Sequence, residues 1–476
     1  MVQSLCGTMS GEGLGYVSNE LPLPEGRYPL MRVYSATSDK PSVNHRVTKS
    51  SYIKAQAVRQ ASEKAAASPA SKGMSMLNFT KKFSSQAPPT PPPPVVTGES
   101  ADYYVFCSGG DTLCVCTLSL SDQDPVVTEK VFQSSDPTCC AANPRTSAVD
   151  NLVTLVGFES GEILLIDALT GTTTGKFNVG SAQNSSCVTD LQWVPESPNM
   201  FVAAFGNGVM LVYDTDKEDR NSTIPNNADA SGVGEAGFVV LHPKTTKNNP
   251  IARWLVTNGP INNINFSANG KLMALSCHDG HCRIFDFAVE KLVYSFRSHY
   301  GAILCSAWSP DNKFLVTGGE DDLVVAWAWV DKVPVACCKG HNSWISSIAF
   351  DRALCDTSDE HNYRFHTVAQ DGRLCTWDLN EGNLVFSRKR AGTTSRRTSF
   401  ATPPAAGKSV LRNVAEVPRS DEMASLTPTG NVLIDQEPLS SVCVTPLGVV
   451  TCCFSGEAKL WARPSADGGT PRDDDD

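Results

Sequence analysis

The sequence has no long hydrophobic run: nowhere do about 18 apolar residues follow one another, so no membrane-spanning helix is expected. The first residues carry neither a cationic stretch nor a continuous apolar core, so they do not resemble a secretory signal. Charged residues are scarce at 19%, which is low for a bundle of amphipathic helices. Basic residues do not prevail, because 40 Lys and Arg face 50 Asp and Glu, and a net charge of −10 disfavours nucleic acid as the main partner.

Catalytic signatures are missing as well. The chain has no glycine-rich phosphate loop, no nucleophile elbow and no HExxH metal motif. We therefore expect a protein that is not an enzyme and that needs no cofactor or metal. Residues 277–282 (CHDGHC) contain four potential zinc ligands, but consecutive residues can hardly surround a tetrahedral ion. A tight Asp-Gly hairpin between two strands is the simpler interpretation.

Cysteine, in contrast, is plentiful, with 17 copies that mostly lie inside apolar, strand-like runs. Adjacent residues such as Cys337 and Cys338 point to opposite faces of a strand and cannot easily form a disulfide. In a chain without a signal peptide, such cysteines are interpreted as small buried hydrophobes in a reducing compartment. The predicted location is the cytoplasm, and the nucleus stays open as a second one.

A repeat begins near Asp102. Each unit has an alternating strand, a polar turn, a second strand, and a Gly or Asp turn before a third strand that ends in an aromatic residue. The third-strand aromatics Phe285, Trp327 and Trp377 lie 42 and 50 residues apart, near the ~40–45-residue period of WD propeller blades. The seven units start at Tyr103, Val153, Val188, Ile261, Ile303, Trp344 and Ser441. The sequence therefore predicts an all-β fold, a seven-bladed WD-repeat β-propeller with four strands in each blade.

Composition divides the chain into three parts. Residues 1–100 are rich in Pro, Ala and Ser and are expected to be mostly disordered, except that 26–35 could add an outer strand. The propeller is predicted over 101–464, with insertions at 217–258 and 381–435, and 465–476 form an acidic, disordered tail. Because an open edge aggregates, the last blade must receive a strand from elsewhere in the chain. Candidates are the segment near Tyr103 and the segment from Tyr28 to Tyr34.

WD repeats join a His before the first strand, an Asp before the third strand and a Trp on it through hydrogen bonds. The residues that match this pattern are predicted to hold blades together and not to bind ligands. They are His341, Asp371, Trp377 and Asp378 in the sixth unit and His299, Asp321 and Trp327 in the fifth. Asp279 precedes Phe285 by the same step, with Phe in place of Trp. Thr317 and Thr367 are candidates for the hydroxyl that completes the set.

Two segments go beyond this general pattern: FLVTGGEDDLV, from Phe314, and GHNSWISSIAFD, from Gly340. Together with the block from Asn249 to Asp351 and the opening PEGRYPL, they resemble the WD-repeat group of CreC-like catabolite-repression proteins and their animal relatives. The resemblance implies a non-catalytic scaffold, a cofactor that binds and activates a ubiquitin-specific protease and acts as a deubiquitinase cofactor in the ubiquitin pathway. It leaves open a second WD-repeat protein as a further partner.

Other binding classes stay open. One is the substrate receptor of a cullin-type ubiquitin ligase, which carries Trp-Asp-x-Arg at the end of a third strand. Here Trp377 and Asp378 are followed by Leu379 and Asn380 and lack the Arg. A general WD-repeat interaction scaffold is the other alternative.

Two aromatic residues are predicted to bind the partner. Tyr300 and Trp344 lie in the loops before the first strands of consecutive blades, and such loops open on one face of a propeller. The alternative for Trp344 is that it covers the edge of its own blade. Elsewhere, the basic residues 388–397 fit a solvated loop, a nuclear-import signal, or a kinase site with Ser399 as the phosphorylated residue.

Overall fold

The computed structural model describes the propeller strands and the segments that join most of them. The described residues are 17–35, 52–54, 103–118, 126–133, 135–147, 151–195, 197–219, 238–244, 247–298, 300–355, 362–385, 414–416, 418 and 422–464. The expectations of disorder for most of 1–100 and for the acidic tail, and the basic loop with Ser399, lie outside the described residues. No helix in the described ranges is long and apolar enough to cross a membrane.

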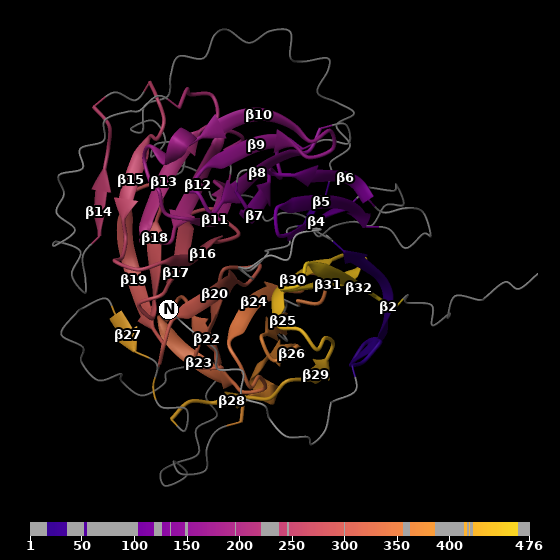
Figure 1. Cartoon of the computed structure of the whole chain (residues 1–476). Coiled ribbons are helices and arrows are strands. Elements are labelled where there is room, and N and C mark those ends of the chain that lie inside the picture. The colour runs from indigo at the N-terminus through magenta and orange to yellow at the C-terminus, as the bar shows by residue number, and fades with distance from the viewer. Residues whose placement is uncertain are drawn as a thin grey trace, which may run out of the picture.

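Seven β-sheets stand as blades around a ring (Figure 1). Blade 1 contains β3 (Tyr52–Lys54), β4 (Tyr103–Gly109), β5 (Thr112–Leu118) and β6 (Val126–Val131). Blade 2 contains β7 (Pro137–Ala142), β8 (Val153–Phe158), β9 (Ile163–Asp167) and β10 (Thr172–Phe177). Blade 3 contains β11 (Val188–Trp193), β12 (Met200–Phe205), β13 (Val209–Asp214), β15 (Ala252–Leu255) and β14 (Val239–Leu241).

The remaining blades follow in chain order around the ring. Blade 4 contains β16 (Ile261–Phe266), β17 (Leu272–Cys277), β18 (His281–Asp286), β19 (Lys291–Arg297) and β27 (Val414–Glu416). Blade 5 contains β20 (Ile303–Trp308), β21 (Phe314–Gly319), β22 (Val324–Ala328), β23 (Val333–Cys338) and β28 (Ser425–Leu426). Blade 6 contains β24 (Ile345–Phe350), β25 (Tyr363–Ala369), β26 (Arg373–Leu379) and β29 (Gly430–Leu433). Blade 7 contains β30 (Leu439–Thr445), β31 (Gly448–Cys453), β32 (Glu457–Ala462), β2 (Gly26–Ser35) and β1 (Glu20–Leu23). Two short 3₁₀ turns are η1 (Val179–Ser181) and η3 (Glu381–Asn383).

The middle strands of the blades are apolar on both faces because each blade packs between two neighbours. Every residue of β21 and β22 is buried, for example, whereas the outer strand β10 is largely exposed. A short, continuous apolar run bounded by turns is what a fully buried strand requires. The core is thus a series of layers between blades and contains most of the described cysteines.

The ring is closed by a strand from the N-terminal region. β2 pairs antiparallel with β32, with Leu30 opposite Trp461 and Ser35 opposite Glu457. In Figure 1 the indigo β2 lies beside the yellow β32. The prediction that the segment from Tyr28 to Tyr34 completes the last blade is therefore confirmed. The alternative near Tyr103 is wrong, because that residue begins β4, which pairs with β3 in blade 1.

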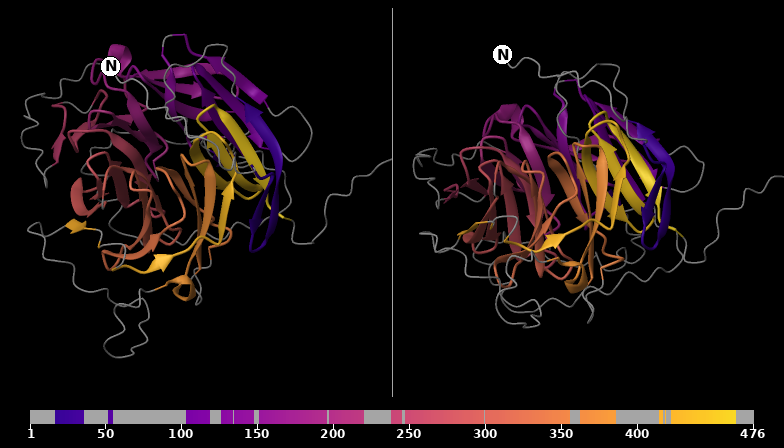
Figure 2. Two further views of the ribbon diagram at one scale, coloured as in Figure 1. Left: turned by 60° about the horizontal axis from the view of Figure 1, so that its bottom comes forward. Right: turned by 90° about the horizontal axis from the view of Figure 1, so that it is seen from below.

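Both segments interpreted as insertions contribute strands. Residues 217–258 contain β14 and β15, and β15 pairs with β13 as the fourth strand of blade 3. Residues 381–435 contain β27, β28 and β29, which lie on the rim of blades 4, 5 and 6 (Figures 1 and 2). We call β27, β28 and β29 together with Met423 the outer belt. The sequence interpretation differs here because strands of two to four residues show no hydrophobic period.

The outer belt joins three blades from outside. β27 pairs parallel with β19, β28 pairs parallel with β23, and β29 pairs antiparallel with β26. Two apolar side chains anchor it: Met423 is 7% exposed among residues of blades 4 and 5, and Leu426 is fully buried among residues of blades 5 and 6. The chain therefore turns back by two blades before it completes blade 6.

Candidate functional site

The WD hydrogen-bond set is complete in blade 6. The His341 Nδ1 lies 3.2 Å from an Asp371 carboxylate oxygen, and its Nε2 lies 2.7 Å from the Thr367 hydroxyl. The Trp377 indole donates to the same hydroxyl at 2.8 Å. Burial alone would raise the pKa of Asp371, but the hydrogen bond from His341 and the charge attraction outweigh it and lower that pKa. The set joins the first, second and third strands at one end of the blade.

The Trp–Thr part of the set recurs in two further blades. Trp327 donates to Thr317 at 2.9 Å in blade 5, and Trp461 donates to Thr451 at 3.0 Å in blade 7. In all three blades the Thr lies ten residues before the Trp. Sequence reasoning missed Thr451, although this spacing was available. His299 lies outside the described residues.

Blades 4 and 7 contain carboxylate-to-cation pairs with other cations. In blade 4 the Arg283 guanidinium holds Asp279 through contacts of 2.6 and 2.9 Å. In blade 7 the Lys459 ammonium lies 2.7 Å from Asp435, and both side chains are largely buried. Both bases lie on the third strand, two residues before its aromatic residue. Asp279 precedes the third strand, as Asp371 does in blade 6, whereas Asp435 precedes the first strand β30 at the position that His341 has in blade 6. The repeat pattern specifies a His before the first strand and therefore does not predict these pairs.

A Thr367→Val substitution should lower the free energy of unfolding by about 1–3 kcal/mol. It removes the buried hydroxyl that hydrogen-bonds to the His341 ring and accepts from the Trp377 indole, so both buried groups lose their partner. Chemical denaturation of the full chain measures this loss. Thr172→Val, at an exposed position on β10, is the matched control and should change stability by less than about 0.5 kcal/mol. Equal stability of the two variants would contradict a structural role for the set.

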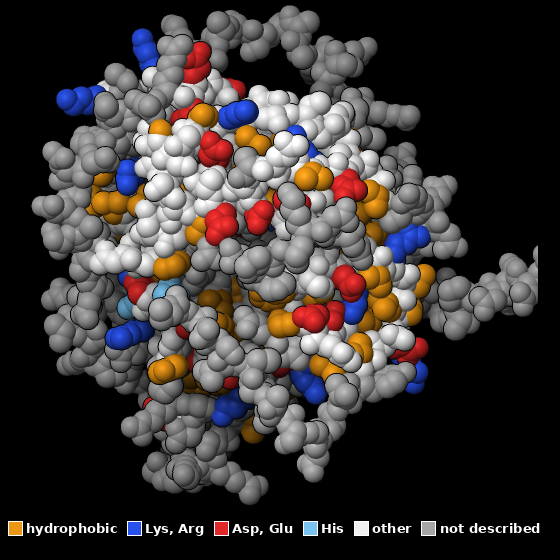
Figure 3. Space-filling model, viewed as in Figure 1, with side chains coloured by type: hydrophobic (Ala, Val, Ile, Leu, Met, Phe, Trp, Pro, Cys, Tyr) orange, Lys and Arg blue, Asp and Glu red, His pale blue; other side chains and the backbone are white. Residues whose placement is uncertain are grey.

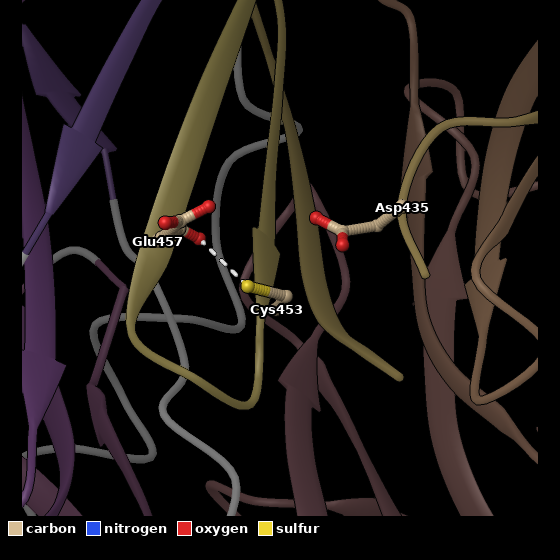
Figure 4. A group of neighbouring side chains, drawn as sticks. All are labelled: Asp435, Cys453 and Glu457. Atoms are coloured by element: carbon tan, nitrogen blue, oxygen red, sulfur yellow. Dashed lines mark hydrogen bonds between the residues drawn. The ribbon is translucent and has the colours of Figure 1, made fainter. Parts of the chain in front are cut away.

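One group of potential metal ligands occurs among the described residues: Asp435, Cys453 and Glu457, shown in Figure 4. Asp435 is already neutralised by Lys459, and the Cys453 thiol donates to the Glu457 backbone carbonyl at 3.5 Å. Burial raises the pKa of Cys453, which disfavours the thiolate that a metal would need. We assign no metal to this group.

Residues 277–282 form the predicted hairpin between β17 and β18. Cys277 and Cys282 are fully buried in these two strands, and burial raises the pKa of Cys277 to about 12. Asp279 is held by Arg283 and by the Thr257 hydroxyl, which donates at 2.9 Å. These side chains serve the packing of blade 4.

Tyr300 and Trp344 are among the most exposed large apolar side chains of the described residues, at 77% and 45%. They precede β20 and β24, the first strands of neighbouring blades. These strands contact each other, since the Cys305 thiol donates to the Ile345 carbonyl at 3.6 Å. At 45% exposure, about half of the Trp344 side chain is buried against its own blade and the rest faces solvent. The two side chains form the candidate partner surface.

Backbone contacts hold both loops in place. The Glu320 carboxylate accepts from the Ala302 N–H at 2.9 Å, and the Trp344 carbonyl accepts from the Gln370 N–H at 3.0 Å. Gly301 has a φ of +69° and would place a Cβ 2.9 Å from Glu320, so the turn beside Tyr300 requires glycine. The aromatic side chains thus project from pre-formed loops. Around the ring, Asp and Glu side chains are spread across the face in Figure 3.

The Asp378 side chain lies apart from the hydrogen-bond set of His341, Asp371 and Trp377. Its carboxylate accepts two hydrogen bonds of 2.7 Å from Arg364, at the end of the blade away from His341. Both side chains are less than 10% exposed. Because this Asp is buried in an ion pair and is not followed by Arg, the structure adds no support for the ligase-receptor alternative.

The same ion pair belongs to a larger network between blades 6 and 7. Arg364 also contacts Glu25, in the turn between β1 and β2, and Glu25 accepts a hydrogen bond of 2.8 Å from the Tyr28 hydroxyl. Beside it, Arg463 lies 2.7 Å from the buried Asp351. We call these residues the seam network. It ties both the closing hairpin and the end of β32 to blade 6.

Comparison with known proteins shows that the chain is similar to WD-repeat proteins. A family model described as the anaphase-promoting complex subunit 4 WD40 domain matches residues 254–311. The chain is 26% identical over 387 residues to UBP9-binding protein bun62 of Schizosaccharomyces pombe, covering 76% of this chain and 70% of that protein. It is also 29% identical over 346 residues to WD repeat-containing protein 20 homolog of Caenorhabditis elegans, covering 66% of this chain and 44% of that protein.

A solved structure supports the propeller fold of this chain. A chain of the structure titled Crystal Structure of Mitotic Checkpoint Complex superposes with a TM-score of 0.51 over 76% of this chain and 88% of that chain. The sequences are 12% identical, so the similarity concerns the propeller fold alone. The two curated relatives are the group to which the sequence resemblance pointed.

Proposed function

We propose that this WD-repeat protein is a scaffold that binds a ubiquitin-specific protease and activates it, without chemistry of its own. The observation that carries the proposal is the pair of exposed aromatic side chains, Tyr300 and Trp344, on rigid loops of neighbouring blades. Aromatic residues on a pre-formed surface dominate the energy of many protein interfaces. The name of the fission-yeast relative, UBP9-binding protein, supports a protein partner of this class.

We expect Tyr300→Ala and Trp344→Ala each to weaken association with the protease by about 2 kcal/mol or more. The measurement is a titration of the purified protease with the full chain, with the melting temperature of each variant recorded beside it. Val330→Ala, at a position that is 76% exposed and outside the candidate surface, is the control and should leave the affinity unchanged. A large loss of melting temperature with unchanged affinity would assign Trp344 to packing.

The same titration tests the non-catalytic part of the proposal. Saturating amounts of the chain should raise turnover of a ubiquitin conjugate by the protease, while the chain alone gives none. Turnover by the chain alone that changes with a point substitution would overturn this part. A cytoplasmic location, with the nucleus as a second site, and a second WD-repeat partner remain part of the proposal.

A further inference from the structure

The outer edge of blade 1 differs from the edges of most other blades. β6 is the outermost strand of this sheet, and no further strand among the described residues pairs with it. Blades 3, 4, 5 and 7 each carry a fifth strand. A strand at the edge of a sheet presents every second N–H and C=O group outward, where another strand can pair with it.

Exposed valines lie along β6. Val127 and Val131 are 42% and 56% exposed, and the exposed Glu129 lies between them. The intervening Thr128 and Lys130 point toward blade 2, where they contact the Leu169 carbonyl at 2.5 Å and the Thr173 hydroxyl at 3.2 Å. Glu129 and Val131 therefore lie on the face turned away from blade 2. Glu129 has no ion-pair partner within the described part of the chain.

Comparison with the other edges shows that this arrangement is not general. The edge strand of blade 2 is β10, whose exposed outer residues are Thr172, Thr173 and Thr174. Where this protein covers an edge itself, the added segment inserts a buried apolar side chain, such as Leu426 beside blade 5 or Leu21 beside blade 7. Blade 1 presents Val127 and Val131 at its outer edge, and the described residues provide no covering strand.

We propose that β6 is a docking edge for an extended segment of a partner protein, which adds a fifth strand to blade 1. The segment carries a Lys or Arg opposite Glu129 and an apolar residue two positions away, opposite Val131. Main-chain hydrogen bonds to the edge provide the affinity, and the two side-chain contacts across the strands provide the specificity. This edge lies on the rim of the ring, so the proposal is independent of the Tyr300 and Trp344 surface.

The probe is a fluorescein-labelled ten-residue peptide of alternating Val and Thr with a central Lys, titrated against the full chain. Two matched peptides replace the Lys by Glu or a central Thr by Pro, which removes a main-chain donor. We expect the Lys peptide to bind at least tenfold more tightly than either. Glu129→Lys should reverse the preference between the Lys and Glu peptides, and Val131→Asp should weaken binding at least tenfold.

Thr174→Asp, on the edge of blade 2, is the matched control and should leave peptide binding unchanged. The proposal is overturned if no peptide binds, or if binding is the same for the Lys and Glu peptides. It is also overturned if β6 variants bind like the parent chain. The variant Glu129→Val gives a further test. If this variant self-associates while the parent chain binds no peptide, Glu129 protects the edge from aggregation and the docking proposal is wrong.

Discussion

A chain that lacks residues 1–36 is expected to yield no soluble, cooperatively folded protein. The deletion removes β1 and β2 and with them the buried Leu21, Leu23, Tyr28 and Tyr34. Burial of one large apolar side chain is worth roughly 1.5–3 kcal/mol, so together these residues approach the whole stability of a typical domain, about 5–15 kcal/mol. The deletion also exposes β32 as an unpaired edge.

Expression of the truncated chain, followed by sedimentation of the lysate and thermal unfolding of any soluble fraction, measures this result. The matched control is removal of residues 1–16, which precede the described strands and leave the closing hairpin intact. This shorter deletion should retain solubility and a sharp transition. A soluble monomer from the longer deletion, with the parent melting temperature, would contradict the role of β2 in closing the ring.

The second large effect is expected for Arg364→Ala. This substitution leaves the carboxylate of Asp378 buried without its cation and removes the cationic partner of Glu25. Breaking a buried ion pair by removing one member costs about 3–5 kcal/mol, because the remaining charge is desolvated and uncompensated. Equilibrium unfolding in urea measures the difference. The double variant Arg364→Met with Asp378→Leu should lose clearly less, since it leaves no charge behind at that position.

The pH dependence provides an independent test of the seam network. Burial would raise the pKa of Asp378, but the Arg364 hydrogen bonds and charge outweigh it, so the pKa in the folded chain lies below the ordinary value of 3.8. A carboxyl group with a lowered pKa in the folded state contributes stability above its unfolded pKa and loses it as the pH falls through the folded one. The parent chain should therefore lose stability below about pH 4, and the double variant should lose less. Parallel pH profiles for the two would contradict this contribution.

The sequence predicted the parts of the fold that leave a local pattern. Buried strands such as β21 and β22 appear as apolar runs, and β2 appears as a weak alternation with the bounds that the structure gives. The outer belt left no such signal, since β27 and β28 contain three and two residues and pair with strands far back in the chain. Their positions depend on single anchors such as Leu426, which no periodicity reveals.

In the candidate site, too, the sequence predicted the residues that follow a local pattern and not the others. Trp377, His341 and Asp371 could be found because the repeat places them at fixed steps. Arg283 and Lys459 pair with carboxylates from the third strand, where the repeat pattern specifies no cation. Exposure of Tyr300 depends on how the neighbouring loop folds, which the sequence suggested only through the adjacent Gly301.

The way in which the ring closes also sets when this protein can finish folding during synthesis. Among the described elements, β1 and β2 leave the ribosome first, and they pair with β32, which leaves it last. At about 5–20 residues per second, the two halves of blade 7 are separated by tens of seconds of translation. Until then, the edge of β2 and the apolar faces of the unfinished blades stay open to other chains. A long-range closure of this kind favours slow folding and dependence on chaperones in the nascent chain.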